Sequence, residues 1–220
     1  MWPHVKSHKM QAMVELQISK GITKFKAATI AEAQMAAEAG ASDVLLAYPL
    51  VGPNIPRFLK LQSEYRETCF WATGDDIKQL DILGSFAKQQ HTKVNFLADV
   101  NLGTNRTGVG IEKLKEFYKN VAKITGLCPK GLHCYDGNYG IADFNARKAM
   151  VDQSDRSVFK VADQLKSEGY DCSVLVMGET PTFPCHAQYE NVYLSPGTSI
   201  VCDFGYSELY RDEPFIPAGI

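Results

Sequence analysis

The chain has 220 residues, 45% of them hydrophobic and 22% charged, a composition typical of one soluble globular domain with a substantial core. The formal net charge of −2 provides no attraction for nucleic acid or an anionic membrane, and no apolar run is long enough to span a bilayer. The N-terminus lacks a signal-peptide pattern, and the six cysteines form no C-x-x-C pair. We therefore expect a cytoplasmic protein with reduced thiols and no nucleic-acid or membrane partner.

The first residues of the chain place a lysine where sheet proteins keep their ligands. Pro3 disfavours a helix, so residues 2–6 are expected to be extended, and an apolar helical pattern follows over residues 10–20. Lys6 then lies at the carboxyl end of a strand, which faces the ligand crevice in a sheet wound with helices. A desolvated lysine amine there can form a Schiff base, although an ordinary surface lysine is favoured when this residue is taken alone.

Two histidines lie close to this lysine, four positions apart. His4 and His8 would share a face on a helix and could then bind zinc together. Because the chain between them is expected to be extended and turning, we expect no metal site here. Paired surface or supporting histidines are the favoured interpretation.

Buried strands alternate with helical patterns along the rest of the chain. The expected strands cover residues 24–28, 43–47, 68–72, 93–100, 131–135, 172–177 and 191–194. With the N-terminal segment this makes eight strands, mostly separated by helices. The α/β pattern favours a closed (β/α)8 TIM barrel over an open doubly wound sheet. No G-x-G-x-x-G follows the first strand, which lowers the dinucleotide-binding alternative.

Polar residues follow the carboxyl ends of the expected strands, where barrel enzymes keep their active sites. They are Lys6, Tyr48, Arg106, Tyr135, Asp136, Thr180 and Ser195. The loops after the last two strands, 178–182 and 195–198, combine glycines with hydroxyl groups and could bind phosphate. Ordinary turn chemistry explains the same residues equally well.

Three of these residues suggest a flat, charged ligand. Arg106 could neutralise an anion or donate to a ring nitrogen, or it could be a solvated surface arginine. Tyr135 could pack on a flat ligand or be a rim aromatic, and Asp136 is favoured as the start of an Asp-Gly turn over an acid or base. A lysine, a phosphate cradle and an aromatic around one mouth suggest pyridoxal 5′-phosphate (PLP). A phosphate-binding Schiff-base aldolase without PLP is the less favoured alternative.

Several motifs resemble one known family. Residues 3–9, Pro-His-Val-Lys-Ser-His-Lys, resemble the PHVKTHK signature of the D-threonine aldolase and D-serine dehydratase group. Members of that group are PLP enzymes with an alanine-racemase-type barrel, known as fold type III. Further resemblances follow in chain order over residues 45–52, 105–108, 131–137, 180–184, 195–198 and 203–206.

The resemblance implies a cofactor, a set of site residues and a reaction. Lys6 would be the catalytic Schiff-base lysine, Arg106 would face the pyridine nitrogen, and Tyr135 would line the cofactor. His4 is a further cofactor-binding candidate, and the phosphate would be held by Gly178, Thr180, Ser195, Gly197 and Thr198. The substrate would be a D-configured β-hydroxy amino acid, cleaved to glycine and an aldehyde or dehydrated as D-serine is. The alternative is a barrel that binds and carries PLP without catalysis.

The sequence departs from the family in three places. Family members continue into a C-terminal β domain with divalent metal ligands, whereas here the barrel is assigned to residues 1–203 and residues 204–220 to an extended tail. Asn138 stands where the family has a histidine after Y-D-G, and Glu179 stands where glycine is common. We therefore expect PLP binding with little or no lyase turnover, and no metal ligands in this chain. Family members dimerise, so a homodimer is compatible with the resemblance.

Overall fold

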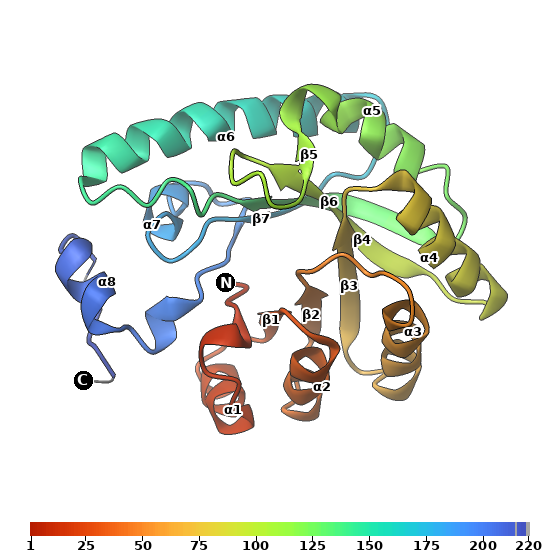
Figure 1. Ribbon diagram of the computed structural model, residues 1–220, viewed down its shortest axis with the longest axis horizontal. Coiled ribbons are helices and arrows are strands. Elements are labelled where there is room, and N and C mark those ends of the chain that lie inside the picture. The colour runs from red at the N-terminus through yellow and green to blue at the C-terminus, as the bar shows by residue number, and fades with distance from the viewer. Residues whose placement is uncertain (214, 219–220) are drawn as a thin grey trace.

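The protein is built on a parallel sheet that curls into a barrel (Figure 1). The computed structural model describes residues 1–213 and 215–218. Its strands in this part of the chain are β1 Lys24–Ala27, β2 Asp43–Leu46, β3 Cys69–Gly74, β4 Val94–Asn101, β5 Val109–Gly110, β6 Leu127–Tyr135, β7 Val174–Met177 and β8 Tyr193–Leu194. They pair in parallel in the order β1-β2-β3-β4-β6-β7-β8, and the short β5 pairs with β4.

Residues 2–4 close the barrel between its first and last strands. The backbone N–H of Trp2 donates to the carbonyl of Leu194 at 2.7 Å, and the N–H of Lys26 donates to the carbonyl of Pro3 at 2.8 Å. The N-terminal segment thus takes the place of a strand between β8 and β1. The expected (β/α)8 barrel is confirmed, and the N-terminal segment occupies the position of its first strand.

The extended part of this segment is shorter than the sequence predicts. Val5–Ser7 form a 3-10 helix, η1, so Lys6 lies in a turn just beyond the extended residues and not at the end of a strand. The His4 side chain causes this ending, because its Nδ1 accepts a hydrogen bond from the Lys6 N–H at 3.2 Å and caps the turn. Lys6 nevertheless stays at the carboxyl end of the barrel.

Helices surround the outside of the curled sheet (Figure 1). The described α-helices are α1 Gln11–Ser19, α2 Ile30–Glu38, α3 Asn54–Glu64, α4 Ile77–Gln89, α5 Ile111–Val121, α6 Phe144–Ser167, α7 Phe183–His186 and α8 Phe204–Leu209, and a second 3-10 helix, η2, covers Thr198–Ile200. The capping box expected before α2 is present: Thr29 Oγ1 accepts from the Glu32 N–H at 3.1 Å, and the Glu32 carboxylate accepts from the Ala28 N–H at 2.8 Å.

Helix α8 corrects the expectation of an extended tail. Its first turn is capped by Asp203, whose carboxylate accepts a hydrogen bond from the Tyr206 N–H at 2.9 Å. The Asp-Phe-Gly-Tyr stretch therefore begins a helix, so the prediction for residues 204–209 is wrong. Pro214, Gly219 and Ile220, also assigned to the tail, lie outside the described residues, and the domain boundary at residue 203 stays a prediction.

Apolar side chains fill the interior of the barrel on the side away from the carboxyl ends of its strands. The Trp2 ring meets the rings of Trp71 and Tyr193 edge-on, at centroid distances of 5.5 and 5.3 Å. Leu45 and Leu97 are fully buried beside them. Because the interior is packed here, ligands can enter only at the carboxyl end, where the interior becomes polar.

Most of the cysteines are buried in the fold. All six cysteines are free, and Cys134, Cys172, Cys185 and Cys202 are buried. Within the described ranges, no helix combines the length and the apolarity needed to cross a bilayer.

Candidate functional site

The carboxyl end of the barrel opens into a cavity of about 170 Å³. Five residues singled out from the sequence line it together, namely His4, Lys6, Tyr48, Arg106 and Tyr135. They come from the N-terminal segment, from the loops after β2 and β4 and from the end of β6. Residues far apart in the sequence therefore meet at one mouth, as the barrel topology requires.

His4 supports the turn that carries Lys6. Its side chain is 7% exposed, and burial, together with the charges of Lys26 and Lys6, lowers the pKa of His4 to about 2. A neutral ring leaves Nδ1 free to accept from the Lys6 N–H. His4 thus fixes the backbone under an exposed amine that projects into the mouth.

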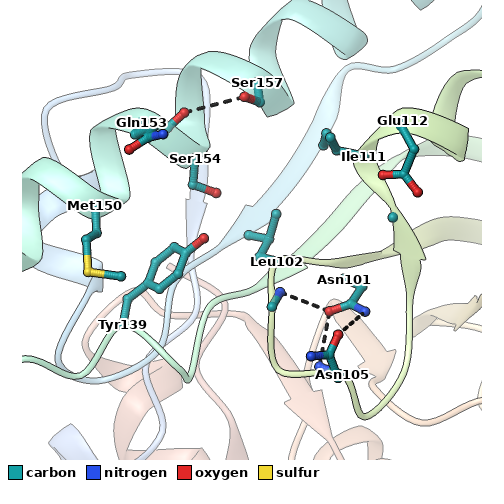
Figure 2. A pocket seen from close by; sticks show the side chains of 12 residues that line it. Asn101, Leu102, Asn105, Ile111, Glu112, Tyr139, Met150, Gln153, Ser154 and Ser157 are labelled. Carbon is teal, nitrogen blue, oxygen red and sulfur yellow. Dashed lines mark hydrogen bonds between the residues drawn. The ribbon is translucent and has the colours of Figure 1, made fainter.

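Arg106 is held over Tyr135 by a well-bonded loop, part of which Figure 2 shows. Asn101 Oδ1 accepts from the backbone N–H groups of Gly103 and Asn105 at 2.9 and 3.2 Å, and its Nδ2 donates to Asn105 Oδ1 at 3.0 Å. The guanidinium carbon of Arg106 lies 4.9 Å from the centroid of the Tyr135 ring. This is cation–π geometry, and it orders both side chains at the mouth.

A larger cavity of about 560 Å³ lies beside this loop (Figure 2). It is lined by the loop residues 101–105, by the start of α5, by Tyr139 and by one face of α6. Its lining contains the carboxylate of Glu112 but no lysine, arginine or histidine. The smaller cavity is therefore the better candidate, because the reactive and cationic side chains gather there.

The Y-D-G sequence, which begins at the last residue of β6, positions the Tyr135 ring. A Cβ atom at Gly137 would lie 2.2 Å from the Tyr135 hydroxyl, so only glycine allows this close approach. Asn138, which replaces the family's histidine, donates from Nδ2 to the carbonyl of Leu102 at 3.2 Å and does not line the mouth. The half-buried Tyr135 ring is thus fixed without help from residue 138.

The loops proposed to bind phosphate are joined to each other. Thr180 Oγ1 accepts from the backbone N–H groups of Gly197 and Thr198 at 3.1 and 2.9 Å. The hydroxyl groups of Ser195 and Ser199 are buried and have no hydrogen-bond partner among the described residues. Two orphaned hydroxyls in one turn fit an anion-binding site, because each can donate to an oxyanion.

The turn also packs against the N-terminal segment. Ser7 Oγ donates to the carbonyl of Gly197 at 2.9 Å, and a Cβ atom at Gly197 would lie 3.4 Å from His4 Cβ. Gly178, at the start of the neighbouring loop, has a φ of +83°, and a Cβ there would meet His186 Cδ2 at 2.9 Å. The contacts of Gly197 place the 195–198 turn beside Ser7 and His4, which flank Lys6, while the role of both loops in binding phosphate stays a prediction.

A buried histidine cluster supports the 178–182 loop. His186 Nε2 lies 2.8 Å from Asp136 Oδ2, and its Nδ1 lies 3.0 Å from Asp155 Oδ2. Thr182 Oγ1 donates to Asp136 Oδ1 at 2.8 Å. Although burial opposes it, the two carboxylates raise the pKa of His186 to about 9, so the ring is charged at neutral pH. Asp136 also begins the turn expected from the sequence, because its carbonyl accepts from the Tyr139 N–H at 2.9 Å, while its carboxylate belongs to this cluster.

Glu179 lies near enough to Asp136, Lys6 and Lys26 for their charges to act on its carboxyl group. Burial and the neighbouring Asp136 raise the pKa of Glu179 to about 7, whereas Lys6 and Lys26 oppose the rise. A carboxyl group with this pKa can gain or lose a proton near neutral pH. Both ring nitrogens of His186 are used in hydrogen bonds, and in the described part of the chain no group of three or more His, Cys, Asp or Glu side chains is arranged to hold a metal ion.

Sequence reasoning missed three buried residues at the floor of the mouth. Lys26 Nζ lies 3.5 Å from His133 Nε2, and His133 Nδ1 lies 2.7 Å from Asp99 Oδ1. The signal for Lys26 is the K-F-K-A pattern of β1, in which Lys24 and Lys26 alternate with buried Phe25 and therefore share the inner face. Because lysine is seldom buried, two lysines on the inner face of one barrel strand are a signal from which Lys26 could have been predicted as a site residue.

The fold and the mouth define a class: a (β/α)8 barrel with the Lys6 amine and a glycine- and hydroxyl-rich turn at its carboxyl end. The family model of the alanine racemase N-terminal domain matches residues 1–203, so the chain belongs to that family. Among solved structures, the D-threonine aldolase from Filomicrobium marinum superposes with a TM-score of 0.87 at 26% identity, covering 99% of this chain and 59% of the aldolase.

Two further similarities extend this comparison. The D-threo-3-hydroxyaspartate dehydratase of Delftia sp. (strain HT23) is 23% identical over 184 residues, which cover 82% of this chain and 48% of the dehydratase. The solved structure of that dehydratase has a TM-score of 0.85 at 21% identity and covers 94% of this chain and 55% of its own, which shows the shared fold. The chain spans about half the length of these relatives.

Proposed function

We propose that this protein is a PLP-dependent lyase that acts on D-configured β-hydroxy amino acids. The observation that carries the proposal is the hydrogen bond of Ser7, the neighbour of Lys6, to Gly197, because residues 195–199 include the buried hydroxyls of Ser195 and Ser199 that have no partner among the described residues. Membership of the alanine racemase N-terminal domain family supports it. The aldolase and the dehydratase described above support the lyase class and the D-hydroxy amino acid substrate.

The residues at the mouth fit this cofactor. Ser195 and Ser199 would donate to the phosphate, and Thr180 would hold the turn in shape through its two backbone hydrogen bonds. Tyr135 would pack against the ring, and Arg106 would face the pyridine nitrogen. When bound through an amine, PLP withdraws electrons from the bonds of the substrate's Cα atom.

The chain's own groups would handle the protons. Lys6 would hold the cofactor and exchange a proton with Cα from its side of the ring. Glu179, with its pKa of about 7, could hold the proton that the β-hydroxyl group releases. In retro-aldol cleavage the Cα–Cβ bond breaks, the hydroxyl carbon becomes an aldehyde and Cα takes up a proton to give glycine. In dehydration the Cα proton and the β-hydroxyl leave together as water.

The first experiment is the visible absorbance of the purified chain with added PLP, compared between wild type and Lys6→Ala. Lys9→Ala is the matched control, because Lys9 lies three residues away with its side chain 65% exposed. A band of covalently bound cofactor is expected in wild type and Lys9→Ala and not in Lys6→Ala. Borohydride reduction followed by peptide mapping is expected to label Lys6. A folded wild type without a band refutes the proposal.

Turnover of D-threonine and D-serine then separates lyase from carrier. Each substrate is assayed with its L-isomer as control, with and without a divalent metal ion, because metal activation is expected from the resemblance. Release of glycine and aldehyde indicates the aldolase reaction, and loss of water indicates the dehydratase reaction. Turnover of a D-isomer and not of its L-isomer would support the lyase assignment and overturn the expectation of little or no turnover. Covalent PLP binding without turnover of either D-isomer would meet that expectation and favour the non-catalytic PLP-binding alternative for this chain.

A further inference from the structure

The floor of the candidate site contains a cation that the proposed function leaves unused. Lys26, on β1, is 4% exposed, and it lines the same cavity as Lys6. Its Nζ has one hydrogen-bonding neighbour among the described residues, Nε2 of His133 at 3.5 Å. By contrast, Lys24, two positions earlier on the same face, pairs with the carboxylate of Asp43. A buried ammonium group with three donors and one partner is costly, so a missing acceptor is indicated.

His133 and Asp99 orient this ammonium group. Although burial opposes it, the hydrogen bond from His133 keeps the pKa of Asp99 below its ordinary value, so the carboxylate is ionised. Burial lowers the pKa of His133, so its ring is neutral. The Nδ1–H group then donates to Asp99, which leaves the lone pair of Nε2 pointing at Lys26. This chain uses one donor of Lys26 and leaves the other two for a ligand.

The position of Lys26 indicates which part of a ligand it meets. Its Nζ lies 5.9 Å from the centroid of the Tyr135 ring, whose other neighbour is the Arg106 guanidinium group. The turns that would hold phosphate follow β7 and β8, and residues 2–4 separate β8 from β1. Lys26 therefore lies on the far side of Lys6 from the phosphate turns, beside the aromatic ring against which a flat ligand would pack.

We propose that Lys26 contacts the aromatic ring of the cofactor and neutralises its acidic hydroxyl group, and that His133 and Asp99 hold Lys26 in place. The inference rests on the proposed use of PLP. Lys26 is a cofactor-contacting residue in this account, whereas His133 and Asp99 are positioning residues. The contact would supply the acceptor that the buried ammonium lacks in the free protein, and it would form a charge-assisted hydrogen bond.

Several charged groups face Lys26 and share in setting its charge. Burial and the charge of Lys6 lower the pKa of Lys26 to about 7, although three nearby carboxylates oppose the shift. The groups facing it from the N-terminal segment, β4, β6 and the loops beyond β6 and β7 are His4, Lys6, Asp99, His133, Asp136 and Glu179. An anionic ring hydroxyl added to this set would favour the ammonium form.

The test compares PLP with pyridoxal, which has the same ring but lacks the phosphate. Dissociation constants are measured by equilibrium dialysis at pH 7 for wild type, Lys26→Met, Lys26→Arg and Thr180→Val. Lys26→Met is expected to weaken binding of both compounds about 10-fold or more, because a charge-assisted hydrogen bond is lost. Lys26→Arg keeps the cation and is expected to stay within a few-fold of wild type. Thr180→Val is the matched control and is expected to weaken PLP binding alone.

The outcomes separate this inference from the proposed function. If wild type binds PLP and Lys26→Met binds both compounds equally well, the inference is overturned and the proposed function stands. If Lys26→Met weakens PLP binding alone, Lys26 serves the phosphate and the ring contact is refuted. Wild type that binds neither compound refutes the proposed function itself. Circular dichroism of Lys26→Met confirms that the variant is folded, and a reduced cofactor mapped to Lys26 also overturns the inference, since that lysine would then be the covalent amine.

Discussion

Replacing Lys26 with methionine is expected to stabilise the cofactor-free protein at neutral pH. The methionine side chain has a similar length and no charge, so the barrel floor stays filled while the buried ammonium is removed. The lysine has a pKa of about 7 in the folded chain and 10.5 when unperturbed. The unfolded state therefore binds the proton more tightly, and charging Lys26 opposes folding below pH 10.5.

The size of this effect follows from the two pKa values. Proton linkage with a folded pKa of about 7 and an unfolded pKa of 10.5 gives a cost of about 4 kcal/mol at pH 7 and about 2 kcal/mol at pH 9. Because the unfolded state binds more protons between these values, wild-type stability rises with pH in this window relative to the variant. The advantage of Lys26→Met should therefore shrink by about 2 kcal/mol between pH 7 and pH 9.

Urea unfolding measures this difference. The fluorescence of Trp2 and Trp71, both inside the barrel, reports loss of the packed interior. Wild type and Lys26→Met are unfolded in parallel at pH 7 and pH 9, so other groups that titrate in this range, such as Glu213 and His186, cancel in the difference. A difference in unfolding free energy that is the same at both pH values would refute the assignment of a strained, buried charge to Lys26.

Three further substitutions test the supports of the site. Thr180→Val leaves two backbone N–H groups without an acceptor and is expected to cost about 1–3 kcal/mol of stability, with Thr180→Ser restoring it. His186→Gln is expected to destabilise most at low pH, because a raised pKa gives stability that is present below pH 6.5 and lost as pH rises through about 9. Gly131→Ala is expected to separate β6 from β7 and cost about 3 kcal/mol, since its Cβ would lie 1.7 Å from the Val174 carbonyl oxygen.

Denaturant unfolding at fixed pH checks the first and third of these, and a pH series from 6 to 10 checks the second. Thr180→Ser that unfolds as easily as Thr180→Val would contradict the role given to the hydroxyl group. A His186→Gln penalty that grows with pH would show that the ring is neutral in its cluster. Gly131→Ala with wild-type stability would mean that β6 and β7 separate without cost.

The barrel could be predicted from the sequence because its signals are local. Each buried run is followed by a turn and a helical stripe, and Lys6 could be placed at the carboxyl end from Pro3 and the helix that follows. The closing bonds from Trp2 to Leu194 and from His4 to Pro196 each join residues 192 positions apart, so no local pattern encodes them. The turn at Lys6 depends on the His4 side chain, which an argument from backbone preferences leaves out.

Parts of the candidate site could not be predicted because they depend on contacts between distant strands. Arg106 and Tyr135 could be found from their positions after strands. Lys26 could be placed on a strand, but its partner His133 lies 107 residues away. Likewise, the charge on His186 depends on carboxylates that fold beside it from α6 and from the loop after β6. Burial and pairing of this kind become visible only in three dimensions.

The contacts that close the barrel between the N-terminal segment and residues 194–197 are expected to be the last to form during folding. The hydrogen bond from Ser7 to Gly197 joins residues 190 positions apart, and forming such a contact carries a large loop-closure entropy. Proteins dominated by long-range contacts fold slowly, so these closing contacts are expected to form after the strands from β1 to β8 have paired. Any ligand held by both Lys6 and the 195–198 turn would link the two segments that close the barrel. It would bind only the closed barrel and would protect these contacts from local opening by mass action.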